Sequence, residues 1–303
     1  MARHAARALA LRYRVTKGSG FRLSDYDPDD MAPGASKERA QALLARGIER
    51  LRAEQERLYA DDNWSVLLIF QAMDAAGKDG AIEHVMSGVN PQGCQVYSFK
   101  APTDEELDHD YMWRTTKSLP ERGRIGIFNR SYYEEVLVAR VHPEVLERQR
   151  IPEELVTRKI WSERFEDMVA FERYLTRNGV VILKFFLHVS REEQRRRFNA
   201  RIDTPEKQWK FSAADVAERA HWDDYMSAYQ DMIRHTATAY APWYVVPADN
   251  KWYTRVVVAS AIVEALESLN LKFPRVTMAK KRELEKAKRA LELEETKRRG
   301  QRR

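Results

Sequence analysis

The sequence is poor in cysteine and lacks any long apolar run. Cys94 is the only cysteine among 303 residues, which excludes an internal disulfide and a zinc site built from several cysteines. The longest apolar run, residues 180–189, contains Lys184 and His188 and is shorter than the ~18 residues that a membrane-spanning helix needs. We therefore expect no membrane partner and a reducing compartment, the cytoplasm.

We also expect no secretory signal in the amino-terminal segment. Residues 1–15 (MARHAARALALRYRV) contain arginines but no apolar core and no cleavage site of small residues. An Arg-rich, acid-poor start is shared with organelle transit peptides, which stay an alternative to a cytoplasmic location.

The sequence shows no motif for metal-dependent hydrolysis or for a serine nucleophile. Its seven histidines are scattered, without an H-E-x-x-H motif or zinc-ligand spacing. No serine has evident His and Asp partners. Phosphoryl transfer to a phosphate acceptor needs neither, because such an acceptor is already ionised near neutral pH, with a second pKa of ~6. Alignment and charge neutralisation then suffice for catalysis.

The net charge of +6 comes from two terminal arms. Residues 1–22 carry six Lys or Arg and no acid, and residues 276–303 carry eleven Lys or Arg and five Glu. Each arm therefore contributes +6, and the body between them carries −6. This distribution is weak evidence for nucleic-acid binding, which we do not expect. We interpret the arms as solubilising or subunit-contacting tails, with capture of a polyanion as the alternative.

Short apolar runs alternate with helical stretches from Trp64 onward. The runs are WSVLLIF, VYSF, RIGIF, VVILKFFLHV and WYVVPA, at 64–70, 96–99, 124–128, 180–189 and 243–248. Helices are expected after Ser36 as N-cap, near Lys78, over 105–118, from Ser131, over 152–178 and over 253–269. Apolar strands separated by helices indicate a parallel sheet covered on both faces. We predict an α/β fold: a three-layer α/β/α P-loop kinase with a parallel five-stranded sheet and a helical lid.

Three regions follow from this pattern. Residues 1–60 form an N-terminal arm and helix, residues 61–275 form the kinase core, and residues 276–303 form a basic charged C-terminal helix or tail. The lid occupies residues 190–220 of the core.

The first strand runs into QAMDAAGKDG (71–80), a loop of small residues that ends in Gly-Lys before a helix. Small residues let backbone N–H groups approach phosphate oxygens, the helix N-terminus is electropositive, and Lys78 adds a point charge. The strict pattern G-x-x-x-x-G-K-[ST] is not met, because Ala72 replaces the first Gly and Asp79 the hydroxyl residue. The strand–loop–helix context nevertheless predicts a phosphate-binding loop. Its predicted members are Ala75, Ala76, Gly77, Lys78 and Asp79.

The missing hydroxyl bears on magnesium, which needs another ligand here. Asp74 lies inside the loop and offers a hard oxygen donor. A carboxylate in a phosphate loop would repel its ligand unless a metal lay between them. We therefore predict that Asp74 binds the metal, directly or through water, and interpret Asp79 as a structural acid favoured by the helix dipole.

A second motif ends the third strand, IFNRSYYEEVLVARVH (127–142). Asn129 stands where P-loop enzymes commonly carry an acid, and it can hydrogen-bond a metal-bound water without adding charge. Arg130 offers a planar fork to phosphate oxygens. The simpler alternative is a surface Arg130 that pairs with Glu134.

The segment SREEQRRRFNARIDTPEKQWKFS (190–212) concentrates basic residues after the fourth strand, where small-molecule kinases carry a lid. A basic lid neutralises phosphates and excludes water. Arg197 and Arg201 share a helix face. Acids are few and Trp209 lies among the lysines, so we favour a lid over a solvated charged helix.

Together these motifs resemble the family-2 polyphosphate kinases. The matching segments are QAMDAAGKDGAIEHVMSGVNPQG, FNRSYYEEVLVARVHPE, REEQRRRFNARIDTPEKQWKFS and APWYVV, in the family's order, and the resemblance extends over residues 23–273. The family's first motif matches Asp74, Gly77 and Lys78. Its second motif often reads Asp-Arg-Ser, where this chain has Asn129-Arg130-Ser131 followed by Glu134. That departure resembles the subgroup called class III, which accepts AMP and ADP and in which the glutamate is implicated in substrate choice.

The resemblance implies a thymidylate-kinase-like fold, dependence on Mg²⁺ (or Mn²⁺) and a homo-oligomer, dimer or tetramer. The family's lid residues map to Arg197, Arg201, Lys207 and Lys210. The expected catalytic residues are Asp74, Lys78, Asn129, Arg130 and Glu134. The expected activity is reversible transfer between inorganic polyphosphate and AMP, ADP or ATP, with GMP and GDP as further acceptors.

Two other functions stay open at this point. One is an ATP-dependent nucleoside or nucleotide kinase, although the sequence shows no diagnostic base-binding signature. The other is a nucleotide-gated nucleic-acid-binding protein that uses the basic arms.

Overall fold

Six strands form one sheet in the order β1-β6-β5-β2-β4-β3. The computed structural model describes residues 2–209 and 211–300. The strands are β1 (Arg14–Val15), β2 (Ser65–Gln71), β3 (Cys94–Ser98), β4 (Ile125–Asn129), β5 (Val180–His188) and β6 (Trp243–Pro247). Strands β2 to β6 are parallel to one another, which confirms the predicted five-stranded parallel arrangement. The antiparallel strand β1 pairs with β6; it was not predicted, because two residues give no readable periodicity.

Strand β2 lies at the centre of the sheet. It pairs with β4 on one side and β5 on the other, and all seven of its residues are buried. In open α/β sheets, ligands bind at the carboxyl ends of the strands. The loop that follows β2 therefore opens in the middle of the edge where a ligand is expected.

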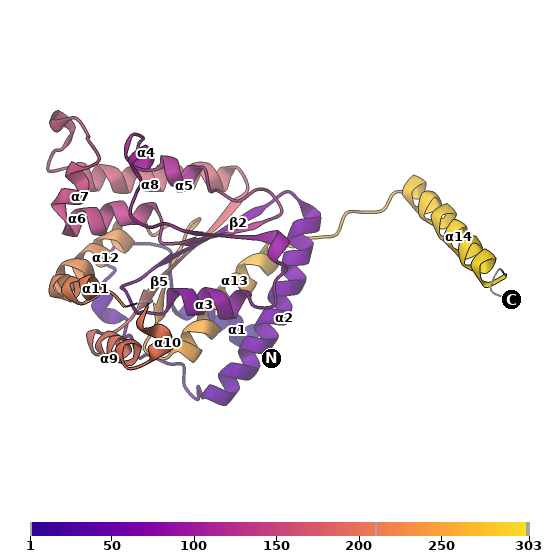
Figure 1. Cartoon of the computed structure of the whole chain (residues 1–303), viewed down its shortest axis with the longest axis horizontal. Helices are drawn as coiled ribbons and strands as arrows, with labels where there is room; N and C mark the ends of the chain where they lie inside the picture. The colour runs from indigo at the N-terminus through magenta and orange to yellow at the C-terminus, as the bar shows by residue number, and fades with distance from the viewer. Residues whose placement is uncertain (1, 210, 301–303) are drawn as a thin grey trace. The chain divides into compact units, whose positions relative to one another are not determined.

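Helices cover both faces of the sheet (Figure 1). On one face, α13 (Lys251–Ser268) packs against α1 (Ala2–Arg12), α2 (Lys37–Asp61) and α3 (Lys78–Met86). Because α13 is enclosed in this way, its central residues 256–263 are buried all round. On the other face lie α8 (Ile160–Arg177), α12 (Trp222–Thr236) and α6 (Val138–Val141).

Helix α2 begins as predicted, since the Ser36 side chain accepts from Arg39 N at 3.3 Å. Three other predicted helices were wrong in extent. The helix expected from Ser131 is a 3₁₀ turn, η3 (Tyr132–Val136), followed by α6 and α7 (Pro143–Glu147). The helix expected over 152–178 starts only at α8, where Thr157 Oγ1 accepts from Lys159 N at 3.1 Å. The helix over 105–118 is split into α4 (Asp104–Leu107) and α5 (Trp113–Thr116).

The lid segment folds into short helices. They are α9 (Arg191–Ile202), α10 (Pro205–Gln208), α11 (Ala213–Ala217) and the 3₁₀ turn η5 (Glu218–His221). The remaining 3₁₀ turns are η1 (Leu23–Asp25), η2 (Pro91–Gly93) and η4 (Glu153–Leu155).

The chain divides into two compact units, Met1–Leu271 and Lys272–Arg303. The first contains the sheet. The second contains one helix, α14 (Met278–Gly300), which is exposed along residues 278–295. Among the described residues, no helix combines the length and the apolar character required to cross a bilayer.

Candidate phosphoryl-transfer site

The loop between β2 and α3 has the backbone of an anion-binding turn. Ala75 and Gly77 both adopt positive φ angles, 61° and 104°. An L side chain rarely adopts the second value, so position 77 requires glycine. Where right-handed and left-handed backbone conformations alternate along a turn, successive N–H groups point into one concave nest that can bind an anion. Helix α3 begins directly after Gly77 and adds the positive end of its dipole.

Lys78 lies over this loop. Its Nζ donates to the carbonyl of Ala72 at 2.8 Å, and the residue is only 8% exposed. Burial, and secondarily the nearby Arg130, lower the pKa of the Lys78 ammonium. One of its three N–H groups is engaged in that bond, so the others can donate to a phosphate at the loop.

Arg130 brings the loop and the second motif together. Its guanidinium donates to Asp74 Oδ1 at 2.8 Å and to Glu134 Oε2 at 3.3 Å. The charges of Glu134 and then Asp74 raise the pKa of Arg130. Its backbone has φ 64°, a left-handed conformation uncommon outside glycine, and its N–H donates to Phe70 O at 3.0 Å. Three predicted site residues therefore form one cluster, and Arg130 is held between two carboxylates.

Asn129 and Asp79 form a second contact at the mouth of the loop. Asn129 Nδ2 donates to Asp79 Oδ1 at 2.7 Å. In the common P-loop arrangement, a hydroxyl follows the lysine and a carboxylate ends the neighbouring strand. Here the carboxylate of Asp79 follows the lysine and the amide of Asn129 ends the strand. The acid therefore comes from the start of α3 and not from the end of β4.

Arg197 fastens the lid to the phosphate loop. Each of its five N–H groups has an acceptor, and the residue is 7% exposed. The acceptors are Glu193 Oε1 (2.7 Å) and the carbonyls of Ala75 (3.1 Å), Ala76 (2.6 Å), Ala248 (2.5 Å) and Asp249 (3.0 Å). The structure therefore places Arg197 behind the loop, as a brace for its backbone.

The other predicted lid residues lie differently. Arg201 is paired with Asp215 of α11 at 4.0 Å, and Lys207 is exposed. Within the part of the chain that the structure describes, neither makes a hydrogen bond or ion pair with the loop. Lys210 lies outside the described residues.

A pocket beside Arg130 contains residues that sequence reasoning missed. Gln194 of the lid donates through Nε2 to Asp74 O at 3.0 Å. Tyr225 and Tyr229 lie one turn apart on α12 and also line the pocket, as do Asp215 and Glu218. Burial, and then the charge of Asp74, raise the pKa of Asp215. The tyrosine spacing in the helix after the lid was the one available signal, but it reads equally well as core packing.

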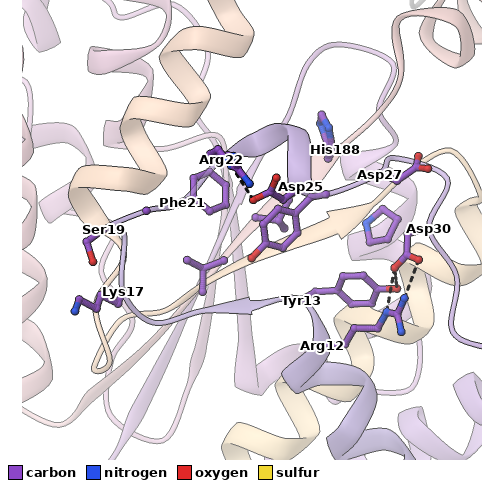
Figure 2. A pocket seen from close by; sticks show the side chains of 15 residues that line it. Arg12, Tyr13, Lys17, Ser19, Phe21, Arg22, Asp25, Asp27, Asp30 and His188 are labelled. Atoms are coloured by element: carbon purple, nitrogen blue, oxygen red, sulfur yellow. Dashed lines mark hydrogen bonds and ion pairs between the residues drawn. The ribbon is translucent and has the colours of Figure 1, made fainter.

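A separate hollow has a volume of about 590 Å³ and is lined by residues of the N-terminal segment and of β5 and β6; Figure 2 shows the side chains that line it. Arg12 and Tyr13 both donate to the carboxylate of Asp30, at 2.8–3.0 Å. Arg22 pairs with Asp25 at 3.2 Å. None of the predicted site residues lines this hollow. These ion pairs join residues within the N-terminal segment and do not involve the cluster around Arg130.

Comparison with known proteins decides the family. The family model described as polyphosphate kinase 2 matches residues 34–274 of this chain. The chain belongs to the polyphosphate kinase 2 family. Membership of this family makes the chain a phosphotransferase. The predicted phosphate loop, residues 129–134 and the predicted lid all lie inside the matched region.

Individual polyphosphate kinases agree with this assignment. The chain is 52% identical over 275 residues to an ADP-polyphosphate phosphotransferase of Rhodopseudomonas palustris, covering 90% of this chain and 95% of that protein. It is 46% identical over 264 residues to an AMP/ADP-polyphosphate phosphotransferase of Meiothermus ruber, covering 87% and 95%. The crystal structure of polyphosphate kinase 2 from Arthrobacter aurescens matches with a TM-score of 0.83 and 42% identity, covering 94% and 96% of the two chains.

Proposed function

We propose that this polyphosphate kinase moves phosphoryl groups reversibly between inorganic polyphosphate and AMP or ADP. The observation that carries the proposal is the cluster of Arg130, Asp74 and Glu134, with Lys78 buried over the adjoining loop after the central strand. Two highly similar relatives are named for ADP and for AMP and ADP as substrates.

On the donor side, the loop N–H groups, the start of α3 and Lys78 hold the terminal phosphates of polyphosphate. These groups are fixed before the substrate arrives, because Arg197 braces the loop carbonyls from behind. A preorganised cationic site stabilises the charge of a phosphoryl group in transfer without reorganising.

On the acceptor side, Arg130 presents its fork to the nucleotide phosphate. That phosphate is a nucleophile without help from a general base, because its oxygen is already ionised near pH 7. Asp74 and Glu134 hold the guanidinium at 2.8 and 3.3 Å until an anion replaces one of them. We propose that Glu134, beside this guanidinium, influences which nucleotide is accepted.

A divalent cation, Mg²⁺ or Mn²⁺, is part of the proposal; when bound, it would neutralise phosphate charge. The described residues contain no group of three or more His, Cys, Asp or Glu side chains able to hold a metal ion. Mg²⁺ fits such a site, since it commonly takes one or two carboxylates together with waters and substrate phosphates. Asp74 and Asp79 would supply carboxylate oxygens for the cation at the loop, and Asn129 would hold it through a water.

The finer expectations belong to the same proposal. GMP and GDP are included as further acceptors, as expected from the sequence. A homo-oligomer and a cytoplasmic location are carried over from the family resemblance and the single cysteine.

One assay tests the function. Purified protein is incubated with Mg²⁺, polyphosphate and AMP, ADP, GMP or GDP, and the di- and triphosphates formed are measured. Parallel reactions replace polyphosphate by ATP and the acceptor by a nucleoside or nucleoside monophosphate. Product only with polyphosphate supports the proposal. Product only with ATP would assign the chain to the ATP-dependent nucleoside or nucleotide kinases.

A further inference from the structure

A fully buried hydrogen-bonded network lies beneath the turn that carries Arg130 and Glu134. Lys184 of β5 donates to Glu172 of α8 at 2.6 Å, and both side chains are 0% exposed. Tyr133 OH donates to Glu172 Oε1 at 2.6 Å, and Tyr132 OH donates to the same oxygen at 2.9 Å. Lys184 also donates to Tyr133 OH at 3.1 Å and to Thr236 O at 2.8 Å. We call these residues the buried tyrosine network.

The network is joined to the site through the chain itself. Tyr132 and Tyr133 are the only residues between Ser131 and Glu134. Tyr133 N donates to Ser131 Oγ at 3.1 Å, which closes the turn directly after Arg130. Burial raises the pKa of both phenols, so they stay protonated and remain donors.

The turn needs such support, because its backbone is not relaxed. Arg130 has φ 64°, a conformation that non-glycine residues keep only where the surrounding structure enforces it. No regular helix follows it, since η3 is a short 3₁₀ turn. Both tyrosine rings are at most 1% exposed, so their anchors fix the turn against the sheet.

A contribution to stability alone does not account for this chemistry. Burying a lysine and a glutamate costs desolvation free energy that apolar residues of similar volume would avoid. The buried pair of Lys184 and Glu172 does fix orientation, because Glu172 holds the hydroxyl of each phenol in one position. The geometry also places all four side chains remote from solvent, so they do not contact a substrate.

We infer that Tyr133, Glu172 and Lys184 are positioning residues: they hold the turn so that Arg130 faces the reacting phosphates while Glu134 orients its guanidinium. The inference rests on the proposed function for its kinetic consequence. Loss of the network lets the turn relax, which misplaces the fork of Arg130 while the donor site at Lys78 is unchanged. The cost then falls on kcat and spares the KM for polyphosphate.

The test compares Tyr133→Phe with Tyr13→Phe. Both changes remove one buried phenol oxygen that donates to a carboxylate, since Tyr13 is 3% exposed and donates to Asp30 at 2.8 Å. We expect Tyr133→Phe to lower kcat at least tenfold with the KM for polyphosphate within twofold. Tyr13→Phe should keep kcat within twofold of the parent. Tyr132→Phe is the second variant, in case Tyr133→Phe fails to fold.

Hydrogen exchange of the backbone amides of residues 130–137 provides a readout that does not depend on turnover. It should speed up in Tyr133→Phe and stay at the parent rate in Tyr13→Phe. Equal kcat and equal exchange in the two variants would overturn the inference. A parent protein without polyphosphate-dependent transfer would instead refute the proposed function, and the exchange comparison would still decide whether the network positions the turn.

Discussion

At the scale of single residues, Lys78 is the side chain on which transfer depends most directly. Its ammonium is buried over the loop with one hydrogen bond to Ala72 O. Lys78→Ala should lower kcat/KM at least about 100-fold, as expected for loss of a preorganised donor in a transfer site. The fold should survive, because only one hydrogen bond is lost. Steady-state kinetics together with thermal unfolding check this, and retained activity in the variant would contradict the site assignment.

Arg197 carries a different prediction, because its five acceptors are protein groups. Arg197→Met leaves those carbonyls and Glu193 without their donor. We expect the free energy of unfolding to fall by at least about 2 kcal/mol and kcat to fall about tenfold through a misplaced loop. Denaturant unfolding and kinetics measure both.

The matched control is Arg195→Met on the same helix, since Arg195 is exposed and forms an ion pair with nearby Glu192. It should behave like the parent. If Arg197 instead bound phosphate, Arg197→Met would raise the KM for polyphosphate in a strongly salt-dependent way. The free energy of unfolding would then stay unchanged.

The site residues show how far single positions can be predicted. The Gly-Lys pair and its strand and helix are local signals, so the loop could be located from the sequence alone. Asn129 and Asp79 lie 50 positions apart, and nothing local shows that their side chains meet at 2.7 Å. The structural role given to Asp79 rested on its place in the first helical turn, which says nothing about its neighbour on the next strand.

At the scale of elements, the parallel strands were predictable because each is an apolar run between helical stretches. The first and last residues of the helices were harder to predict. The stretch after Ser131 has helical spacing, but Arg130 adopts a left-handed backbone and the two tyrosines turn inward to Glu172. Tertiary contacts therefore override the local pattern at the functional turn. The same holds for the lid: its cations looked alike in sequence, but among those that the structure describes Arg197 alone is buried against the loop.

The C-terminal unit allows a test of the nucleic-acid alternative. Helix α14 is exposed along its described side chains and lies in a unit separate from the sheet. Deletion of residues 276–303 should leave turnover within about twofold, because no residue of the proposed transfer site lies there. Polyphosphate-dependent ATP formation and filter binding of DNA and RNA measure the two outcomes. Loss of function on deletion would favour a nucleic-acid-binding role for the basic arm.

At the scale of the whole molecule, His188 links stability to pH. Burial lowers the pKa of His188 to about 4, and nearby Asp249 and Asp27 offset this only in part. The unfolded chain, with an ordinary pKa near ~6.5, binds more protons between these two values. Stability should therefore fall as the pH drops from about 6.5 to 4, by up to about 1.4 kcal/mol per pH unit.

Urea unfolding from pH 4 to pH 7 measures this slope. His188→Gln should flatten it over that window, because the variant has no imidazole to protonate. His221→Gln is the control, since the side chain of His221 is 43% exposed. Identical slopes in the parent and His188→Gln would show that His188 does not contribute to the pH dependence.

Strand β1 is short, but it forms one edge of the sheet beside β6. Tyr13 O accepts from Val245 N at 2.9 Å, and Arg14 and Val15 pair with β6. These residues precede the family-matched region, which begins at residue 34. A shortened chain cut at that point would leave the amides of β6 open to any extended peptide, which is a recognised route to self-association. The start of the family-matched region and the start of the complete sheet are therefore different positions in this molecule.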